Sequence, residues 1–395
     1  MSTMYKFAAL SAVILMGLVA CDRGPLPLDP PSSDYMTKIV SSNLTSNQTW
    51  YADTIYQLGG RITVTNGTTL TIEAGTIIKG EAGTGANATA LLIARGAKLM
   101  AIGTPSLPII FTTIADEISP IQVASGDFKS PNLDPTVTGL WGGVIILGKG
   151  IISASNASGD VNEVQIEGIP TSDPNGLYGG TDNADNSGVL QYISIRHGGA
   201  NIGAGNEING LSLGGVGSGT TIENIEIVSN QDDGIEVWGG MINITNIVSW
   251  NVGDDGFDTD QAWGGTLDNF VIITPKGHCF ELDGPEGTYA VSHTIKNGNI
   301  QASDDNVTSE DLINTDANSL VSLESIYITD ILPGQIINRL DAPGVLYTDI
   351  VLNVDTVSNF LKNGGTHPGI TAGTTPKANT SVFSWTWAAQ AGIIQ

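Results

Sequence analysis

The chain is poor in cysteine, histidine and positive charge. Its 395 residues contain two Cys, four His and 15 Lys and Arg against 40 Asp and Glu, for a formal net charge of −25. So few cysteines exclude a disulfide-stapled scaffold. The deficit of cations makes nucleic acid and anionic surfaces poor partners, and it favours cations or neutral ligands that form many hydrogen bonds.

Long apolar runs are also absent, except for one at the N-terminus. Lys6 precedes an apolar stretch from Phe7 to Ala20, which is too short for an ordinary membrane-spanning helix and typical of a secretory signal. Residues 18–21, Leu-Val-Ala-Cys, resemble a bacterial lipobox. The resemblance implies that residues 1–20 are a lipoprotein signal peptide and that Cys21 carries lipid. The alternative is a simple signal peptide followed by a chance cysteine.

Two predictions follow from a lipidated Cys21. Cys279 has no partner, so we expect no disulfide but a small, buried, inert thiol. Residues 21–45 are rich in Pro and Ser, without periodicity, and we expect a tether that holds the domain off the membrane.

Four copies of a short pattern organise the middle of the chain. They start at Asn209, Asp233, Asp255 and His278, at steps of 24, 22 and 23 residues. Each copy alternates apolar and polar residues, and a second strand-like run follows in each unit, as in NIEIVS at 224–229. This period and alternation predict an all-β fold, a single parallel β-helix, which we expect to be right-handed like most parallel crossovers.

Stacking the four units places their strand residues in columns. Strand side chains alternate between two faces, so every second column should point into the coil. The inward columns are Leu211, Ile235, Phe257, Phe280 and Leu213, Val237, Thr259, Leu282. The outward columns are Ser212, Glu236, Asp258, Glu281 and Gly214, Trp238, Asp260, Asp283.

The same kind of pattern extends over one domain, residues 46–395. An irregular stretch at about 155–188, rich in Gly, Asp and Asn, predicts a loop insert. The final VFSWTWAAQAGIIQ is aromatic and atypical, and we expect it to be a short C-terminal cap over the last open coil.

Carboxylates in neighbouring coils suggest a cation site. Asp and Asn before Gly are ordinary turn formers, which accounts for Asn209, Asp233 and Asp255. It does not account for an outward column of Glu236, Asp258 and Glu281 with Asp260 and Asp283 beside it. Strands lie about 4.8 Å apart, so these charges repel unless they are protonated, paired or bridged by metal, and calcium is the natural bridge. A solvated acidic face and a catalytic role are the alternatives.

Within this face Asp258 and Asp260 are the predicted metal ligands. A second candidate is the insert, where Asp182 and Asp185 lie among Asn, Thr and Gly at 180–188. An ordinary polar turn explains that stretch equally well. We expect no organic cofactor.

Tryptophans beside the acidic columns suggest carbohydrate. Trp238 and Trp263 lie next to Gly, and flat indoles flanked by carboxylates are suited to binding neutral sugar rings. The alternative is that they cover coil edges. The predicted ligand-binding set is Trp238, Trp263, Glu236, Asp258, Asp260, Glu281 and Asp283.

The motifs support a family resemblance over residues 46–395. LTIEAGTIIKG (70–80), GLWGGVIILGK (139–149) and VGDDGFDTDQAWGG (252–265) resemble right-handed β-helix lipoproteins of Bacteroidota in the pectate-lyase-like superfamily. The resemblance implies this fold and an envelope location, as an outer-membrane lipoprotein with the cell surface favoured. It implies little about activity, because fold alone does not settle function.

An enzymatic resemblance is also present. Gly253-Asp254-Asp255 and Gly277-His278-Cys279 are similar to motifs of polygalacturonase-like hydrolases, and Asp233 stands where that family places another acid. This implies Asp233, Asp254 and Asp255 as acid or base, with His278 in support. The chain departs from the pattern at Cys279 and Gln231, and the Arg-Ile-Lys of that family appears as Thr294-Ile295-Lys296.

The sequence therefore favours an envelope-anchored binding protein, monomeric and held to the membrane by lipid, that binds a polysaccharide with calcium. The alternatives are a polysaccharide-degrading hydrolase or lyase, and a structural adhesin or scaffold.

Overall fold

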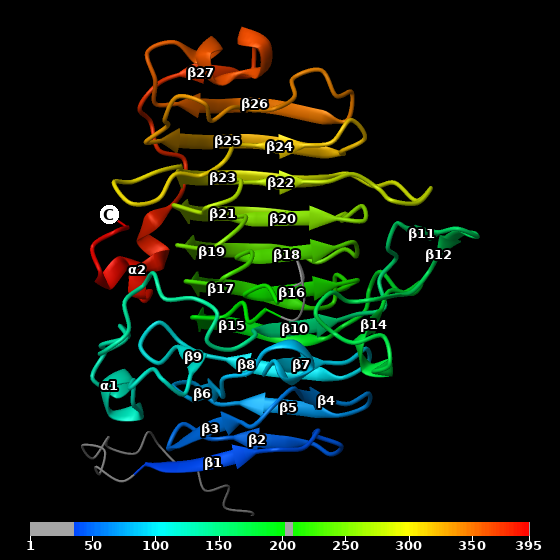
Figure 1. The fold of residues 1–395 in the computed structure, drawn as a ribbon, viewed down its shortest axis with the longest axis vertical. Coiled ribbons are helices and arrows are strands. Elements are labelled where there is room, and N and C mark those ends of the chain that lie inside the picture. Colours follow the sequence, from blue (N-terminus) through cyan, green and yellow to red (C-terminus); the bar gives the residue numbers. More distant parts are fainter. Residues whose placement is uncertain (1–34, 202–207, 395) are drawn as a thin grey trace, which may run out of the picture.

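The protein is a tall stack of coils in a computed structural model that describes residues 35–201 and 208–394. Figure 1 shows the coils following one another along the long axis, from β1 at one end to β27 at the other. Neighbouring strands in the two main sheets run parallel. The predicted all-β parallel β-helix is confirmed.

Among the described residues the longer sheet has 15 strands. They are β1 (Met36–Val40), β2 (Gln48–Trp50), β3 (Thr54–Leu58), β5 (Thr69–Ile72), β6 (Ile77–Gly80), β8 (Lys98–Ile102), β9 (Ile109–Thr113), β15 (Gly188–Arg196), β17 (Thr221–Val228), β19 (Ile244–Trp250), β21 (Thr266–Ile273), β23 (His293–Gln301), β25 (Val321–Thr329), β26 (Val345–Leu352) and β27 (Ile370–Ala372).

The second sheet has eight strands in the same part of the chain. They are β4 (Ile62–Val64), β7 (Leu91–Ile93), β10 (Val144–Leu147), β16 (Leu211–Gly214), β18 (Ile235–Trp238), β20 (Phe257–Asp260), β22 (Glu281–Leu282) and β24 (Asn314–Thr315). The remaining strands and helices are β11 (Ala154–Asn156), β12 (Gly159–Val161), β13 (Val164–Gln165), β14 (Leu177–Tyr178), α1 (Pro120–Ala124) and α2 (Trp387–Gln390), with 3-10 turns at Gly85–Asn87, Pro174–Gly176, Val357–Phe360, Lys362–Gly364 and Thr380–Phe383.

The predicted columns match the strand register. Leu211 pairs with Ile235 and Ile235 with Phe257, and all three side chains are fully buried inside the coil. Glu236 pairs with Asp258 and Asp258 with Glu281 on the opposite face of the same strands. The period of two therefore assigned each side chain to the correct side of the sheet.

One inward glycine makes room for an aromatic ring, which yields a test of the core. A Cβ on Gly298 would lie 1.9 Å from Cζ of Phe270, whose ring packs edge-on against Phe280 at 5.3 Å. We expect Gly298→Ala to lower the free energy of unfolding by about 1–3 kcal/mol through overpacking. Denaturant unfolding of this variant and of Gly59→Ala, whose added Cβ would meet no atom closer than 3.5 Å, measures it. Neither glycine has a positive φ, so the difference between the two losses reports overpacking, and equal losses would contradict the packing explanation.

A row of hydrogen-bonded asparagines, one from each of three neighbouring strands, lies at a bend in the long sheet. Asn224, Asn246 and Asn269 have φ values of 58°, 59° and 62°, a left-handed conformation that Asn tolerates better than most residues. Asn246 Nδ2 donates to Asn224 Oδ1 (3.1 Å), and Asn269 Nδ2 donates to Asn246 Oδ1 (2.7 Å). The row therefore holds successive coils in register at a bend that the sequence analysis did not recognise.

The fold starts earlier than predicted. β1 lies within the stretch assigned to the tether at 21–45, and its five residues pair in parallel with β3. The Pro-rich composition ends at Pro31, and the MTKIV of β1 is then a usable strand. The predicted boundary at residue 46 is wrong, because residues 36–40 already belong to the long sheet.

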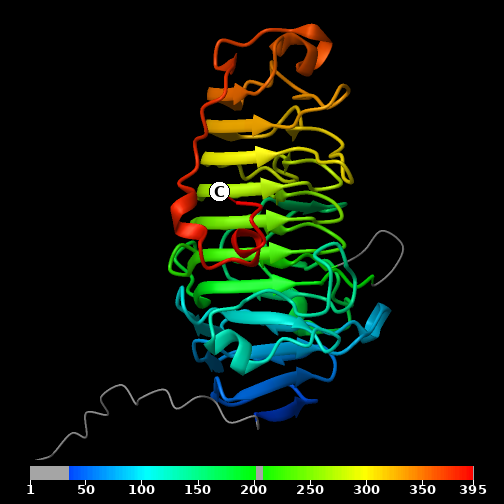
Figure 2. The same ribbon diagram turned by 90° about the vertical axis from the view of Figure 1, so that its left-hand side faces the viewer.

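The C-terminal stretch is not a cap over the last coil. Figure 2 shows this red segment running back along the outer face of the long sheet. Phe383, Trp387 and Ala388 pack there against Val228, Val248, Trp250, Val271 and Ile273. The outward positions of these strands are apolar, so they need a cover, and the C-terminal segment supplies it.

The insert is folded and covers the second sheet. The small antiparallel pairs β11–β12 and β13–β14 form within it. Tyr178 lies directly over Gly214, where a Cβ would come within 2.7 Å of its ring. Ile152, Ile166 and Ile169 pack with it against the outer face of that sheet. The outward columns of β16 and β18 are therefore buried.

Candidate functional site

The acidic side chains are positioned by the turns that enter β18, β20 and β22. Asp233 Oδ1 accepts the backbone N–H of Asp255 (2.9 Å), and Asp255 Oδ1 accepts the backbone N–H of His278 (2.5 Å). Each turn residue thus satisfies a backbone donor of the next coil. The turn-forming role that the sequence indicated is present, and it fixes the side chains in a stack.

Three of these carboxyl groups form a buried cluster, which we call the inner acidic cluster. Asp233, Glu236 and Asp258 are 7%, 5% and 8% exposed, and one oxygen from each lies within 4.8 Å of the others. Asn209 Nδ2 donates to Glu236 Oε2 (2.5 Å). Asp258 Oδ1 is buried and has no hydrogen-bond partner among the described residues.

Burial and mutual repulsion raise the pKa of all three groups well above the ordinary carboxyl range. Burial is the larger cause for Asp233, Glu236 and Asp258, and the charges of the neighbouring carboxylates add to it. At neutral pH the cluster therefore needs protons or a bound cation. A divalent cation would stabilise three buried carboxyl groups that lie this close together.

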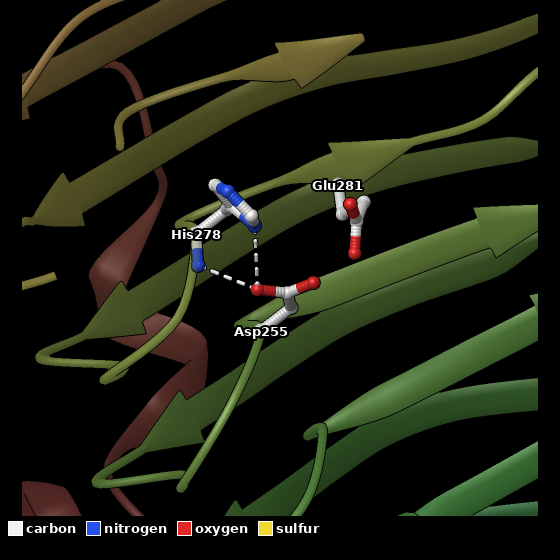
Figure 3. A group of neighbouring side chains, drawn as sticks. All are labelled: Asp255, His278 and Glu281. Carbon is white, nitrogen blue, oxygen red and sulfur yellow. Dashed lines mark hydrogen bonds and ion pairs between the residues drawn. The ribbon is translucent and has the colours of Figure 1, made fainter. Parts of the chain in front are cut away.

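A second group lies one coil further along and is more open. Figure 3 shows Asp255 between His278 and Glu281. His278 Nδ1 lies 3.0 Å from Asp255 Oδ1, and one ligand atom from each of the three residues lies within 4.8 Å of the others. Burial works to lower the pKa of His278, but the hydrogen bond and charge of Asp255, with other acids, raise it to about 9. Burial and Asp255 raise the pKa of Glu281 to about 8.

The third group reaches the surface. Asp232, Asp233 and Asp254 approach within 4.8 Å, with Asp254 exposed and Asp232 half-buried. The four residues suggested by the hydrolase resemblance thus occupy adjacent turns, Asp233 beside Asp254 and Asp255 beside His278. Their proximity permits acid–base chemistry but does not establish it.

The second outward column extends the acidic surface. Asp260 is half-buried, and burial with the charges of Asp283 and Glu286 raises its pKa to about 7. Burial and Asp316 raise the pKa of Asp283 to about 6. Asp260 does not belong to any of the three compact groups found in the described residues, so of the two predicted ligands on this face only Asp258 lies in a cluster.

The insert aspartates are separated from these groups. Asp182 is exposed, and its Oδ1 accepts the backbone N–H of Ala184 (3.1 Å). Asp185 is buried, and its Oδ2 accepts from Ser187 Oγ (3.2 Å). Neither joins a compact group of three metal-ligating side chains in the part of the chain that the structure describes. Local hydrogen bonds of this kind are those of a polar turn.

The tryptophans are not exposed platforms. Trp238 is 6% exposed and packs beside Tyr178 at 6.4 Å, while Trp263 is 1% exposed. Trp263 lies inside the coil, where its Nε1 donates to Ile242 O (2.8 Å). The expectation of open indole faces was wrong, because the insert covers Trp238 and the coil interior encloses Trp263.

One contact of the site could not be predicted from the sequence, whereas the predicted burial of Cys279 is confirmed. Asn314 Nδ2 lies 2.9 Å from His278 Nε2, but the irregular residues before β24 gave no signal for it. Cys279 is a free, fully buried thiol, as predicted, and burial raises its pKa to about 12. It is therefore not a nucleophile at neutral pH.

Comparison with known proteins identifies the family. A model of the pectate-lyase-like β-helix domain matches residues 42–338, which is well over half of the chain. Searches of curated proteins and of solved structures gave no significant match. The match covers the strands from β2 to β25 and all three acidic groups. The chain belongs to the pectate-lyase-like β-helix family.

Proposed function

We propose that this protein is an envelope-anchored lipoprotein that binds carbohydrate through calcium held on its acidic turns. A pectate-lyase-like β-helix domain fits a function in carbohydrate binding or degradation. The observation that carries the cation is the inner acidic cluster, where one oxygen from each of three buried carboxyl groups lies within 4.8 Å of the others. Calcium takes six to eight oxygen ligands, and the three carboxyl groups of the cluster would supply several of them.

The exposed end of the same turns supplies the contact with a ligand. Asp254 and Asp232 lie beside Asp233 at the surface, and carboxylates accept hydrogen bonds from sugar hydroxyls. The net charge of −25 favours a neutral polysaccharide over an acidic one. Because Trp238 and Trp263 are buried, recognition rests on these polar groups rather than on stacking.

Calcium titration followed by thermal unfolding tests the cation site. We expect calcium to raise the melting temperature, with a stabilisation of about 2.7 kcal/mol at 100 times the dissociation constant. Asp258→Asn should abolish most of this rise, whereas the exposed Asp182→Asn should retain it. A rise that survives in Asp258→Asn, or no rise in the parent chain, would overturn the proposed site.

A glycan array probed with the same samples tests the carbohydrate. Binding should require calcium and should be lost in Asp254→Asn without loss of the calcium-dependent stabilisation. Calcium binding without any glycan binding would indicate that the ion has a structural role only. The adhesin or scaffold hypothesis would then replace the carbohydrate-binding function.

Degradation of a polysaccharide is a second candidate, favoured by the proximity of Asp233 and Asp254. The raised pKa of Asp233 suits a general acid, but oxygens within 4.8 Å lie closer than the about 6.5–9.5 Å between carboxyl groups that inverting hydrolases use. Release of reducing ends or of unsaturated products, lost in Asp254→Asn, would support an enzyme. Unchanged polysaccharide after prolonged incubation would exclude it for the substrates tried.

The membrane anchor is proposed from Cys21, which lies outside the described residues. No helix within the described residues is long and apolar enough to cross a membrane. Mass spectrometry of the N-terminal peptide should find lipid on Cys21, and an unmodified cysteine would contradict the anchor. We propose the outer membrane of a Bacteroidota cell, facing outward, as the location.

A further inference from the structure

The N-terminal end of the stack exposes a group of apolar side chains, which we call the apolar end. It comprises Tyr35, Met36, Ile39 and Tyr51, which are 40%, 65%, 61% and 51% exposed. The described chain has nine large apolar residues this exposed, and the other five are scattered from Ile102 to Ile393. Their concentration on the first coil therefore requires an explanation.

These residues all belong to the first coil, where Met36 and Ile39 point to opposite faces of β1. β1 is the terminal strand of the long sheet and pairs with β3. The backbone N–H of Met36 donates to Asp53 O (3.3 Å), which places the turn after Tyr51 beside the start of β1. Figure 1 and Figure 2 show β1 at the extreme end of the stack.

Charge distinguishes this end from the rest of the molecule. Residues 35–113 contain five Lys and Arg and three Asp and Glu, whereas residues 114–395 contain eight against 34. Arg61 and Arg95 form ion pairs with Asp173 and Glu163 of the insert, so the first coils are close to neutral. An anionic surface that would repel the remaining coils does not repel this end.

We propose that the apolar end docks on the surface of a lipid bilayer. Met36 and Ile39 enter the head-group region, with the two tyrosines at the interface that Tyr prefers and the acidic coils pointing away from the membrane. Lys38 is exposed between Met36 and Ile39, and its ammonium lies 5.8 Å from the centroid of the Tyr56 ring on the neighbouring strand. The domain then stands on the membrane rather than being held off it.

The length of chain before the apolar end favours a lipid partner over a soluble one. This step rests on the proposed lipid anchor at Cys21. The 13 residues between Cys21 and Tyr35 span at most about 50 Å when fully extended. A lipid on Cys21 would therefore keep the apolar end at high effective concentration beside the bilayer, so that even weak apolar contacts suffice.

Site-specific fluorescence on the full-length protein tests the docking. Met36→Cys, Ile39→Cys and Leu346→Cys each receive a polarity-sensitive dye, and each variant is reconstituted in phosphatidylcholine vesicles with and without brominated lipid. Leu346 is the matched control, because it is 59% exposed and lies on β26 near the opposite end of the stack. Cys279 is buried, so the introduced thiol takes the label.

We expect dyes at positions 36 and 39 to be quenched at least twofold more by brominated lipid than the dye at 346. Equal, weak quenching at all three positions would overturn docking. A blue shift without lipid quenching at 36 and 39 would also overturn it and would indicate a second copy of the chain as the occupant. Label found on Cys21 would instead show that the anchor has failed, so the two hypotheses fail separately.

Discussion

Replacing Trp387 by alanine should lower the free energy of unfolding of the central coils by about 3–5 kcal/mol, the usual cost of emptying a buried tryptophan site. The indole is 3% exposed and packs edge-on against Trp250 at 6.0 Å. It also covers Arg196, whose Cζ lies 5.0 Å from the ring centroid. The substitution therefore removes both apolar packing and a cation–π contact.

The charged pair beneath Trp387 places the expected loss toward the upper end of this range. Arg196 and Glu226 are fully buried, with Nη2 and Oε2 3.7 Å apart, and Ser194 Oγ bridges them through Arg196 Nε (2.7 Å) and Glu226 Oε2 (2.6 Å). The backbone N–H of Ala388 donates to Glu226 Oε1 (2.9 Å). Opening this site leaves a buried charge incompletely compensated, which costs more than an apolar cavity alone.

Denaturant unfolding combined with hydrogen exchange measures the effect. Exchange should increase most in β17, β19 and β21, which the C-terminal segment covers. Ile393→Ala is the control, because Ile393 belongs to the same segment but is 42% exposed, and we expect it to change stability by less than about 1 kcal/mol. A Trp387→Ala variant as stable as Ile393→Ala would show that the segment does not hold the coils together.

In the presence of chelator, the melting temperature should fall as the pH rises from about 4 to about 8. Burial raises the pKa values of Asp283, Asp260 and Glu281 to about 6, 7 and 8, so the folded chain keeps protons that the unfolded chain releases near pH 4. Stability decreases with pH wherever the folded state binds more protons. The raised pKa of His278 acts in the same direction. The stability that it contributes is fully present below about pH 6.5 and is lost as the pH rises to about 9.

Asp260 sets the scale of this pH effect. Its raised pKa corresponds to at most about 4 kcal/mol at 1.36 kcal/mol per unit of pKa. Asp260→Asn should therefore flatten the curve, whereas the exposed Asp182→Asn should not. Calcium should flatten the curve as well, since it binds the ionised carboxylates. A melting temperature that rises between pH 5 and 8 in chelator would show that these groups are ionised and paired in the folded chain.

Much of the fold could be predicted because the same strand pattern occurs four times in the sequence. The inward columns at Leu211, Ile235 and Phe257, and the Asp–Gly turns at Asp233 and Asp255, follow from a period of two within a period near 22. Cys279 was placed in the interior for the same reason. The acidic column from Glu236 to Glu281 was also read correctly as a stack on one face.

The excursions from the repeat could not be predicted in this way. The irregular residues between β9 and β10 contain α1, and Phe128 from this region packs with Trp385 of the C-terminal segment. No local sequence pattern indicates such a contact between distant parts of the chain. The start of β1 was missed for a related reason, since a five-residue strand at the end of the stack is stabilised by its pairing with β3 rather than by a repeat in its own sequence.

The sequence by itself determined which side chains point into the coil and which point out, because strand alternation is a local property of the backbone. Tertiary structure alone decided what the outward side chains meet. The insert buries Trp238, the C-terminal segment buries Arg196, and neighbouring coils bury the carboxyl groups of Asp233 and Asp258. Burial, rather than the identity of the residues, raises the pKa of those carboxyl groups and makes the inner acidic cluster a candidate cation site.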